Sequence, residues 1–431
     1  MTIHYVDPVR GADANPGTAD KPWKTLAEVL GPATKKLSTR FYDVGNPHGV
    51  TPYGETPAAG AVLKAKNPTG PIKPGDTIKL RSGDHGVVEL RAAYNEDVIR
   101  VVPDSGAEPV LGGLVINGAA KWAFEDGIKV RNLKAAVPRQ IYLVEIGRSS
   151  WFGYAEDIIV SKLLACGGED YRAWTDQQWI DGPIGAIGAL GWSRRVQIVG
   201  NEVYACRNAI AAFGRGARVE ANLVRDNSND SVNFGASDVV IRQNLIKEGR
   251  NSPKDAFHAD GMQGWEPAGH GVVRNVLIER NSITKYGRSK ARTTDDPTVS
   301  YQQGICIFDG RWDGVKIIDN SVVTNSYHAI AAYGVDHLLV ARNTVLATHP
   351  GAVDPWIGVF KGKDGRVPVN NVLRDNTCPV LSAAFEGVVR EHNRVAKRIA
   401  WQQNGKPVYL TAPGLHGSDR IDPLFGTLIT A

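Results

Sequence analysis

Residues 198–222 read IVGNEVYACRNAIAAFGRGARVEAN, and the pattern in this stretch decides the fold. It opens with an aliphatic residue, two variable residues and an asparagine, and it closes on the same four-residue pattern. The pattern recurs down the chain, and its asparagines are Asn201, Asn222, Asn244, Asn281, Asn320, Asn343 and Asn376. Successive asparagines are 21, 22, 37, 39, 23 and 33 residues apart. Internal periods of about 20 to 50 residues predict a solenoid or a propeller.

A second position repeats inside each unit, where a small and an aliphatic residue are soon followed by an aromatic one. These aromatic residues are Phe213, Phe234, Trp265, Phe308, Tyr333 and Phe360. The segments between the two positions are short and rich in β-branched residues, which favours strands. Stacked about 4.8 Å apart as parallel strands, such units share one core and satisfy one another's backbone. We expect the asparagines to form a stacked amide ladder and the aromatic residues a second stack.

With these repeats the chain resembles the right-handed parallel β-helix superfamily, the pectate-lyase-like fold. Residues 4–29, HYVDPVRGADANPGTADKPWKTLAEV, look like the N-terminal segment of many such proteins, with Thr25 at the start of a short capping helix. Residues 73–86 look like a first coil, and IDPLFG at 421–426 resembles the usual exit. The resemblance implies an all-β, single-stranded right-handed parallel β-helix solenoid with an N-terminal capping helix and long loops on one face. Proteins of this fold include lyases, hydrolases, epimerases and phage adhesins.

The same patterns divide the chain into four parts. Residues 1–30 are the N-terminal strand and capping helix, and 31–72 an inserted loop or small lobe. The β-helix itself is expected over 73–399, with a C-terminal tail or cap over 400–431.

Composition narrows the functional class. The 431 residues carry a formal net charge of +5, which fits an acidic partner but is too small for a nucleic-acid-binding module. No apolar run reaches the roughly 18 residues of a membrane span, and no signal peptide is visible at the start. The four cysteines are scattered, which predicts buried free thiols. We expect an extracellular or virion-associated protein, monomeric or homotrimeric, with no nucleic-acid or membrane partner.

Two adjacent units carry the main insertions, over residues 247–260 and 285–303. Loops at the same corner of successive coils lie side by side, and long loops in compact domains are often functional. Aligning the units places several polar residues in files beside these loops, where we expect them to project towards solvent. The predicted substrate-binding residues from this face are Asp230, Asn233, Gln263, Trp265, Gln303, Asp309 and His328.

The densest group of chemically competent residues is Asp255, His258 and Asp260. Asp255 and Asp260 can act as a carboxylate pair in glycoside hydrolysis. The three side chains can instead hold a metal, Ca²⁺ being the expected ion if there is one. In a third interpretation Asp255 and His258 only brace the loop.

The second inserted loop is basic. Lys285, Arg288 and Arg292 lie on it, and Arg250 and Lys254 lie on the neighbouring loop, so a polyanionic sugar chain would be attracted there. β-Elimination of a uronate needs its carboxylate neutralised, a base for the C5 proton and an acid for the leaving oxygen. Lys285 or Arg288 can serve as the base, with Tyr286, His258 or Tyr301 as the proton donor.

The sequence therefore predicts an enzyme that cleaves an acidic, uronate-containing extracellular polysaccharide by β-elimination, with Ca²⁺ or no cofactor. A hydrolase using the Asp255–Asp260 pair and a C5-epimerase are the competing enzyme hypotheses. A phage tailspike-like adhesin or depolymerase is the competing hypothesis from another class.

Overall fold

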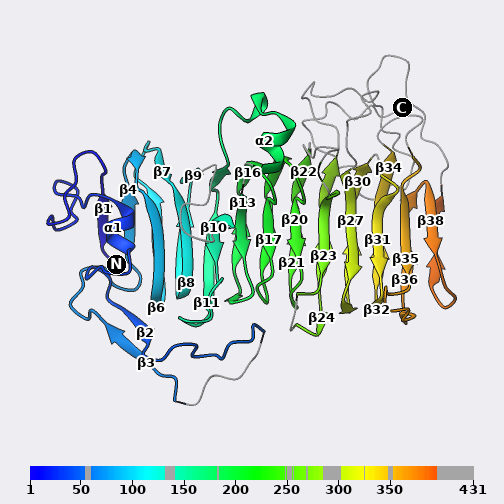
Figure 1. The fold of residues 1–431 in the computed structure, drawn as a ribbon, viewed down its shortest axis with the longest axis horizontal. Coiled ribbons are helices and arrows are strands. Elements are labelled where there is room, and N and C mark those ends of the chain that lie inside the picture. The colour runs from blue at the N-terminus through cyan, green and yellow to red at the C-terminus, as the bar shows by residue number, and fades with distance from the viewer. Residues whose placement is uncertain are drawn as a thin grey trace. The chain divides into compact units, whose positions relative to one another are not determined.

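A computed structural model describes residues 1–53, 60–131, 141–181, 184–247, 249, 255, 257–267, 270–284, 302–324, 326–347 and 353–395. The chain divides into two compact units. Unit 1 comprises Met1–Ala173, Gly182–Cys206 and Ile210–Asn222. Unit 2 comprises Trp174–Asp181, Arg207–Ala209 and Leu223–Ala431. Within each unit, short strands from successive coils pair in parallel and form ladders (Figure 1).

Besides an antiparallel hairpin, unit 1 contains three parallel ladders, and two long strands take part in both the first and the second of these ladders. The first ladder contains the N-terminal parts of β6 (Val87–Pro103) and β8 (Gly113–Glu125), followed by β10 (Tyr142–Ile146), β13 (Gly185–Ala189) and β17 (Ile210–Ala212). The second ladder contains β1 (Ile3–Val6), β4 (Thr77–Leu80), the C-terminal parts of β6 and β8, β11 (Ala155–Ser161), β14 (Ser193–Arg194), β15 (Gln197–Val199) and β18 (Arg218–Glu220). The third contains β5 (Gly83–Asp84), β7 (Pro109–Leu111), β9 (Lys129–Arg131), β12 (Leu164–Cys166) and β16 (Glu202–Cys206).

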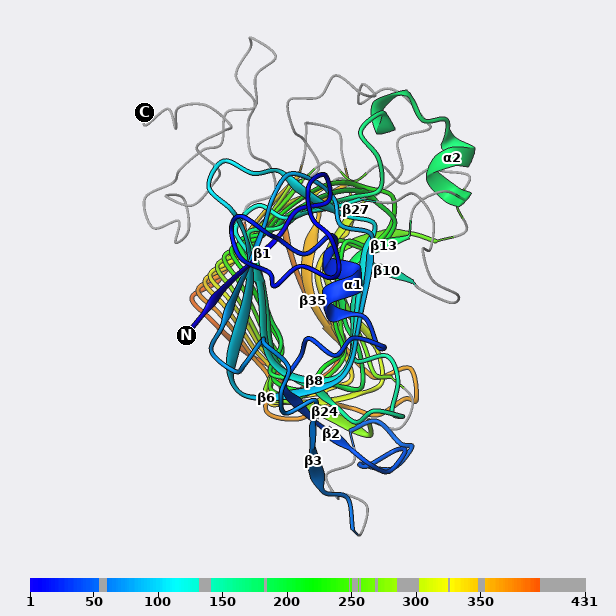
Figure 2. The same ribbon diagram turned by 90° about the vertical axis from the view of Figure 1, so that its left-hand side faces the viewer.

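The N-terminal part of unit 1 contains one short helix. This helix, α1, covers Leu26–Leu30 and lies at the N-terminal end of the coils (Figure 2), and beyond it a capping helix is not evident in the described residues. The predicted start is found, because Thr25 and Glu28 form a reciprocal capping box. The helix ends at once because Gly31 follows it and precedes a proline, a position that disfavours helical backbone.

The stretch predicted as an inserted loop or lobe contains an antiparallel hairpin. Its strands are β2 (Thr39–Tyr42) and β3 (Leu63–Lys66), and Arg40 of β2 also pairs with Tyr94 of β6. Tyr42 packs edge-on against the Tyr94 ring at 5.1 Å, so aromatic contacts hold this hairpin to the coils of unit 1.

Unit 2 carries three long parallel ladders and one short one. The ladder that concerns function, here called the site ladder, contains β20 (Val232–Phe234), β23 (Ala259–Trp265), β27 (Gln302–Asp309), β31 (His328–Tyr333), β35 (Trp356–Phe360) and β38 (Val380–Ala383). The second contains β21 (Val240–Arg242), β25 (Leu277–Glu279), β29 (Lys316–Ile318), β33 (Leu339–Ala341), β36 (Val372–Arg374) and β39 (Val389–Glu391). The third contains β19 (Leu223–Asn227), β22 (Leu245–Lys247), β26 (Ser282–Thr284), β30 (Ser321–Thr324), β34 (Thr344–Ala347), β37 (Thr377–Cys378) and β40 (Arg394–Val395).

The remaining elements are short. The fourth ladder contains β24 (Val272–Arg274), β28 (Arg311–Asp313) and β32 (Val335–Asp336). A 3₁₀ helix, η1 (Tyr171–Ala173), belongs to unit 1, and α2 (Asp176–Asp181) belongs to unit 2. Within the described ranges, neither α-helix has the length and apolar run that a membrane crossing requires.

Aliphatic side chains in register form the core of unit 2. From β20 to β35, the inward column of the site ladder is fully buried and consists of Val232, Met262, Ile305, Ile330 and Ile357. Each such side chain contributes about 1.5–3 kcal/mol of stability through burial. The four cysteines are buried free thiols, as predicted.

The predicted asparagine ladder is present within each unit. In unit 2, the Asn320 side-chain oxygen accepts hydrogen bonds from the main-chain N–H and the amide of Asn281, at 2.9 Å each. Asn320 donates in the same way to Asn343, and its amide also reaches the Ile278 carbonyl. The ladder continues past the predicted series to Asn393.

Candidate active site

Two buried aspartates lie at the start of neighbouring strands of the site ladder. Asp230 precedes β20, and Asp260 is the second residue of β23. The main-chain N–H of Asp260 donates to Asp230 Oδ1 at 2.9 Å, and the Asn233 amide donates to Asp230 Oδ2 at 2.8 Å. The exposed fractions are 5% for Asp230 and 0% for Asp260. The two carboxyl groups therefore share one poorly solvated environment.

Burial makes ionisation of both groups costly. It raises the pKa of Asp230 to about 7, and the charge of Asp260 adds to this effect. Burial also raises the pKa of Asp260, while His258 opposes the rise. Neither carboxylate oxygen of Asp260 has a hydrogen-bond partner of ordinary geometry among the described residues. Since two adjacent buried carboxylates do not both ionise readily, we assign the negative charge to Asp260, which faces a cation, and the proton to Asp230.

That cation is His258. Its Nδ1 lies 3.5 Å from Asp260 Oδ2, and 54% of its side chain is exposed. The interaction with Asp260 raises the pKa of His258 above its usual 6.5. A carboxylate on one ring nitrogen orients the imidazole and leaves Nε2 for a substrate proton. The arrangement is suited to proton transfer.

A second histidine, on the next strands of the ladder, has the opposite character. His328 Nδ1 donates to Gln303 Oε1 at 2.9 Å, which leaves its Nε2 as an acceptor. The Cys306 thiol donates to the same Gln303 oxygen at 3.4 Å. Burial, and then the charge of His258, lowers the pKa of His328 to about 4. His328 is therefore neutral over the usual working range, whereas His258 holds its proton more strongly than a free histidine.

The predicted row of polar residues along these strands is present. It was predicted to face solvent, and this prediction was wrong. Asp260 and Gln303 are register partners, and Gln303 bonds to His328. Asp230, Asp260 and Gln303 are nevertheless 5%, 0% and 7% exposed. Side chains on adjacent coils pack and bond against one another, so the row forms a buried polar network instead of an open polar face. Asn233 is part of this network, and Gln263, its partner on β23, is half-buried.

Contrary to the prediction, Asp255 does not lie in a cluster with His258 and Asp260. Its side chain is 3% exposed and forms an ion pair with Arg207, whose Nη2 lies 3.1 Å from Asp255 Oδ2. Arg207 also donates to the Ile180 carbonyl and lies over the Phe257 ring. Because Asp255 is paired with Arg207, it does not form the predicted carboxylate pair with Asp260. The carboxyl group beside Asp260 is that of Asp230. This agrees with the interpretation that Asp255 braces the loop.

The predicted metal trio is not assembled. In the part of unit 2 that the structure describes, no three histidine, cysteine, aspartate or glutamate side chains gather as metal ligands. Asp255 forms its ion pair with the Arg207 guanidinium, so that of the three predicted ligands only His258 and Asp260 approach each other.

Two predicted substrate-binding residues lie at the other end of the strands. Trp265 ends β23 and Asp309 ends β27, and they are register partners. Asp309 forms an ion pair with Lys363 at 2.6 Å, and 37% of Trp265 is exposed. Trp265 and Asp309 lie at the C-terminal ends of β23 and β27, whereas Asp260 and Gln303 lie near the N-terminal ends of the same strands. The remaining predictions lie outside the described residues: Lys285, Tyr286, Arg288, Arg292, Arg250 and Lys254.

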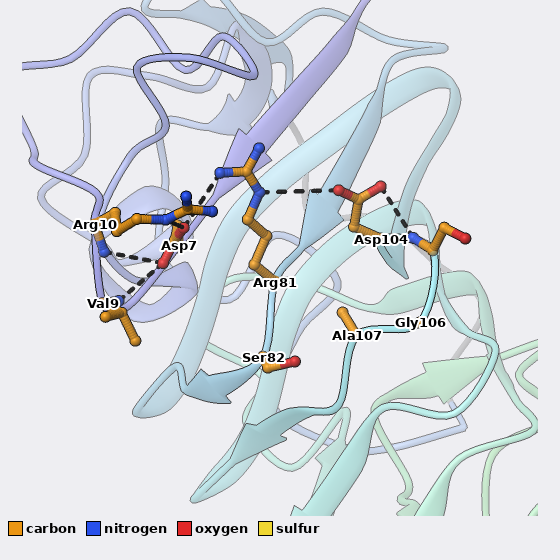
Figure 3. A pocket seen from close by; sticks show the side chains of 9 residues that line it. Asp7, Val9, Arg10, Arg81, Ser82, Asp104, Gly106 and Ala107 are labelled. Carbon is orange, nitrogen blue, oxygen red and sulfur yellow. Dashed lines mark hydrogen bonds and ion pairs between the residues drawn. The ribbon is translucent and has the colours of Figure 1, made fainter.

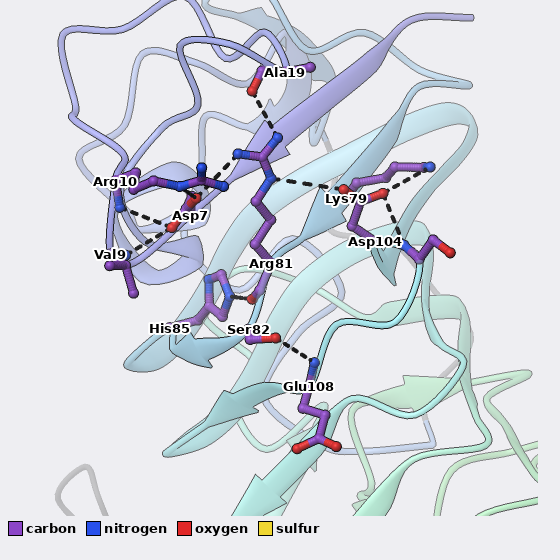
Figure 4. Close-up of polar contacts among 11 residues, drawn as sticks. Asp7, Val9, Arg10, Ala19, Lys79, Arg81, Ser82, His85, Asp104 and Glu108 are labelled. Atoms are coloured by element: carbon purple, nitrogen blue, oxygen red, sulfur yellow. Dashed lines mark hydrogen bonds and ion pairs between the residues drawn. The ribbon is translucent and has the colours of Figure 1, made fainter.

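A separate cavity of about 430 Å³ lies in unit 1 (Figure 3). Its charged residues bind one another: Arg81 lies 3.2 Å from Asp7 and 3.8 Å from Asp104, and Arg10 lies 3.1 Å from Asp7. The surrounding polar contacts fix the same turn, with His85 Nε2 at 2.8 Å from the Arg81 carbonyl oxygen (Figure 4). Since these charges already neutralise one another, we interpret this cavity as a braced turn.

Comparison with known proteins supports the fold. The model of the right-handed β-helix region matches residues 186–345. Among curated protein sequences, none matches the chain. Solved structures with some similarity include a lacto-N-biosidase from Eubacterium ramulus, with a TM-score of 0.49, 14% identity, and coverage of 91% of this chain and 67% of that one. A rhamnogalacturonan lyase has a TM-score of 0.46 and 12% identity, with coverage of 92% and 87%.

A third similar structure is the A-module of a mannuronan C-5 epimerase from Azotobacter vinelandii, with a TM-score of 0.44, 12% identity, and coverage of 74% of this chain and 90% of that one. These similarities do not select one reaction. The parallel strand ladders and the matched region agree on the architecture, and the chain is a right-handed parallel β-helix protein.

Proposed function

We propose that the chain is an enzyme that cleaves an acidic, uronate-containing polysaccharide by β-elimination, with His258 as its proton-transfer group. The observation that carries this proposal is the half-exposed imidazole of His258, backed by the buried Asp260 and Asp230. A buried carboxylate beside an imidazole stabilises the imidazolium that forms when the ring accepts a proton. Asp230 retains its own proton and keeps the cluster from accumulating negative charge.

The reaction balances with one proton-transfer group at the sugar. His258 Nε2 takes the C5 proton, and the electron pair of that C–H bond forms the C4–C5 double bond. The C4–O bond breaks, and the leaving oxygen takes a proton, from the His258 imidazolium where both groups lie on one face of the ring. The substrate carboxylate must be neutralised during this step. The basic residues predicted for that role, such as Arg288, lie outside the described residues, and a Ca²⁺ ion bound with the substrate is the other candidate.

Burial favours elimination over hydrolysis by a carboxylate pair. In a glycosidase both carboxyl groups must reach the scissile bond or its water, and they flank the sugar directly. Asp260 is fully buried, so it has no surface to offer a sugar. A hydrolase remains the second candidate because Asp230, with a pKa of about 7, holds a proton that a general acid needs at neutral pH.

Digestion of polygalacturonate, alginate and hyaluronan, each with and without EDTA, tests the proposal. With at least one polymer, we expect the ultraviolet absorbance of an unsaturated uronate and the number of reducing ends to rise together. Loss of both signals with EDTA, and their recovery with Ca²⁺, would show that the reaction requires the metal. Reducing ends without the absorbance would replace the lyase with the hydrolase.

An epimerase and an adhesin would each give a different outcome in the same assay. A C5-epimerase would produce neither signal but would introduce deuterium at C5 in D₂O, which NMR detects. An adhesin would bind a polymer and leave all of its C–H and C–O bonds unchanged. Either result would overturn the proposed cleavage.

A further inference from the structure

Beside the proton-transfer group, aromatic rings follow the site ladder across several coils. Phe308 lies between the two histidines, with its ring centroid 6.0 Å from that of His258 and 5.2 Å from that of His328. His328 in turn contacts Tyr327 at 4.2 Å and Trp356 at 4.7 Å. We call Phe308, Tyr327, His328 and Trp356 the aromatic shelf.

The shelf leads away from His258 in the direction of the C-terminal coils. His328 is the register partner of Trp356, and Ile305 of β27 is the partner of Ile330 of β31. Neighbouring parallel strands lie about 4.8 Å apart, so each coil advances the shelf by that distance. A line of rings that begins at His258 and crosses β27, β31 and β35 can therefore accompany an extended polymer parallel to the helix axis.

The shelf is open to solvent at Tyr327. This side chain is 52% exposed, although a tyrosine buries a large apolar area when it packs. Its ring lies 6.1 Å from that of Trp356 at an interplanar angle of 35°, so the two form a broken surface instead of a closed stack. His328 between them is neutral and keeps Nε2 as an acceptor, which suits a sugar hydroxyl better than a carboxylate.

Resting on the proposed function, we propose that the aromatic shelf binds the sugar units on one side of the cleaved bond, with a pyranose ring stacked on Tyr327 and Trp356. The C–H face of a pyranose is apolar and packs on an aromatic face, while its hydroxyls remain free for acceptors such as His328 Nε2. The polymer then runs along the helix axis from His258 towards β35. The shelf determines binding and the length of the products, and His258 carries the chemistry.

Tyr327→Ala is the test variant, because its exposed side chain can be removed without opening the core. Binding of hexasaccharides from polygalacturonate, alginate and hyaluronan is measured by calorimetry in the inactive His258→Ala background. We expect Tyr327→Ala to weaken binding by about fivefold to tenfold, as the loss of one aromatic contact would. Tyr327→Phe, which keeps the ring, should bind like the parent. Trp151→Ala, at an exposed tryptophan of unit 1, is the control that should leave binding unchanged.

Further readouts separate the shelf from the reaction and from a structural role. In the active enzyme, Tyr327→Ala should raise KM by a similar factor, leave kcat within about twofold, and lengthen the products. Cleavage with unchanged KM, binding and product length would overturn the shelf while the proposed reaction stands. Binding that depends on Tyr327 without any cleavage would keep the shelf and overturn the reaction. Absence of binding to all three hexasaccharides, or equal loss with Tyr327→Phe, would also overturn the shelf.

Discussion

His258→Ala is expected to lower kcat on the cleaved polysaccharide by about 10²- to 10⁴-fold, the usual contribution of a positioned general base. The reason is that His258 is the exposed member of the cluster, whereas Asp260 and Asp230 are buried behind it. Substrate binding should change little, because the aromatic shelf is intact. Steady-state kinetics on polymer, together with circular dichroism of the folded variant, measure the effect.

A second histidine provides the matched control. His337 is equally exposed, pairs with Asp313 at 2.7 Å and bonds to Asn370, away from the aspartate pair. His337→Ala should keep the parent kcat, which separates the loss of a particular imidazole from the loss of a surface histidine. An active, folded His258→Ala variant would show that the proton-transfer group lies elsewhere.

Asn320→Ala is expected to destabilise unit 2 by about 2–5 kcal/mol, because it leaves several buried groups without partners. Asn320 is 1% exposed. Its oxygen accepts two hydrogen bonds from Asn281, and its amide donates to Asn343 and to the carbonyls of Ile278 and Ile318. The midpoint of urea unfolding measures the loss.

The ladder offers its own control at its C-terminal end. Asn393 makes the same type of contacts with Asn376 but is only half-buried, so water can replace its partners. Asn393→Ala should cost clearly less than Asn320→Ala. Equal losses at both positions, or none at Asn320, would contradict the view that burial of the amide ladder stabilises the coils.

The sequence predicted the fold well because the determining signal is local and repeated. The aliphatic residue three positions before each asparagine of the repeat, such as Ile278 or Ile317, is fully buried in the core. Each of these asparagines belongs to the amide ladder. The aromatic series was also predicted: Tyr333 stacks on Phe360 at 4.7 Å and packs on Phe308 at 5.6 Å. Asn393 was missed because Arg390, the register partner of Leu373, stands where the repeat has an aliphatic residue.

The site was predicted less well because its properties depend on burial and on partners from other coils. Asp255 and Asp260 are close in sequence, but Arg207, far earlier in the chain, takes Asp255. Asp230 and Asp260 are thirty residues apart, and only their adjacent strands make them a pair. The neutral character of His328 arises from its burial among aromatic rings, which spacing alone does not reveal.

The ionisation of His258 tests the central claim most directly, because it requires no substrate. NMR titration of the imidazole nitrogens, with the His258 signals assigned through His258→Gln, gives its pKa in the parent and in Asp260→Asn. We predict a pKa above 6.5 in the parent, since the Asp260 carboxylate stabilises the imidazolium, and a lower pKa in the variant. A pKa of 6.5 or below that is the same in both proteins would contradict the assignment of His258, Asp260 and Asp230 as one proton-transfer centre.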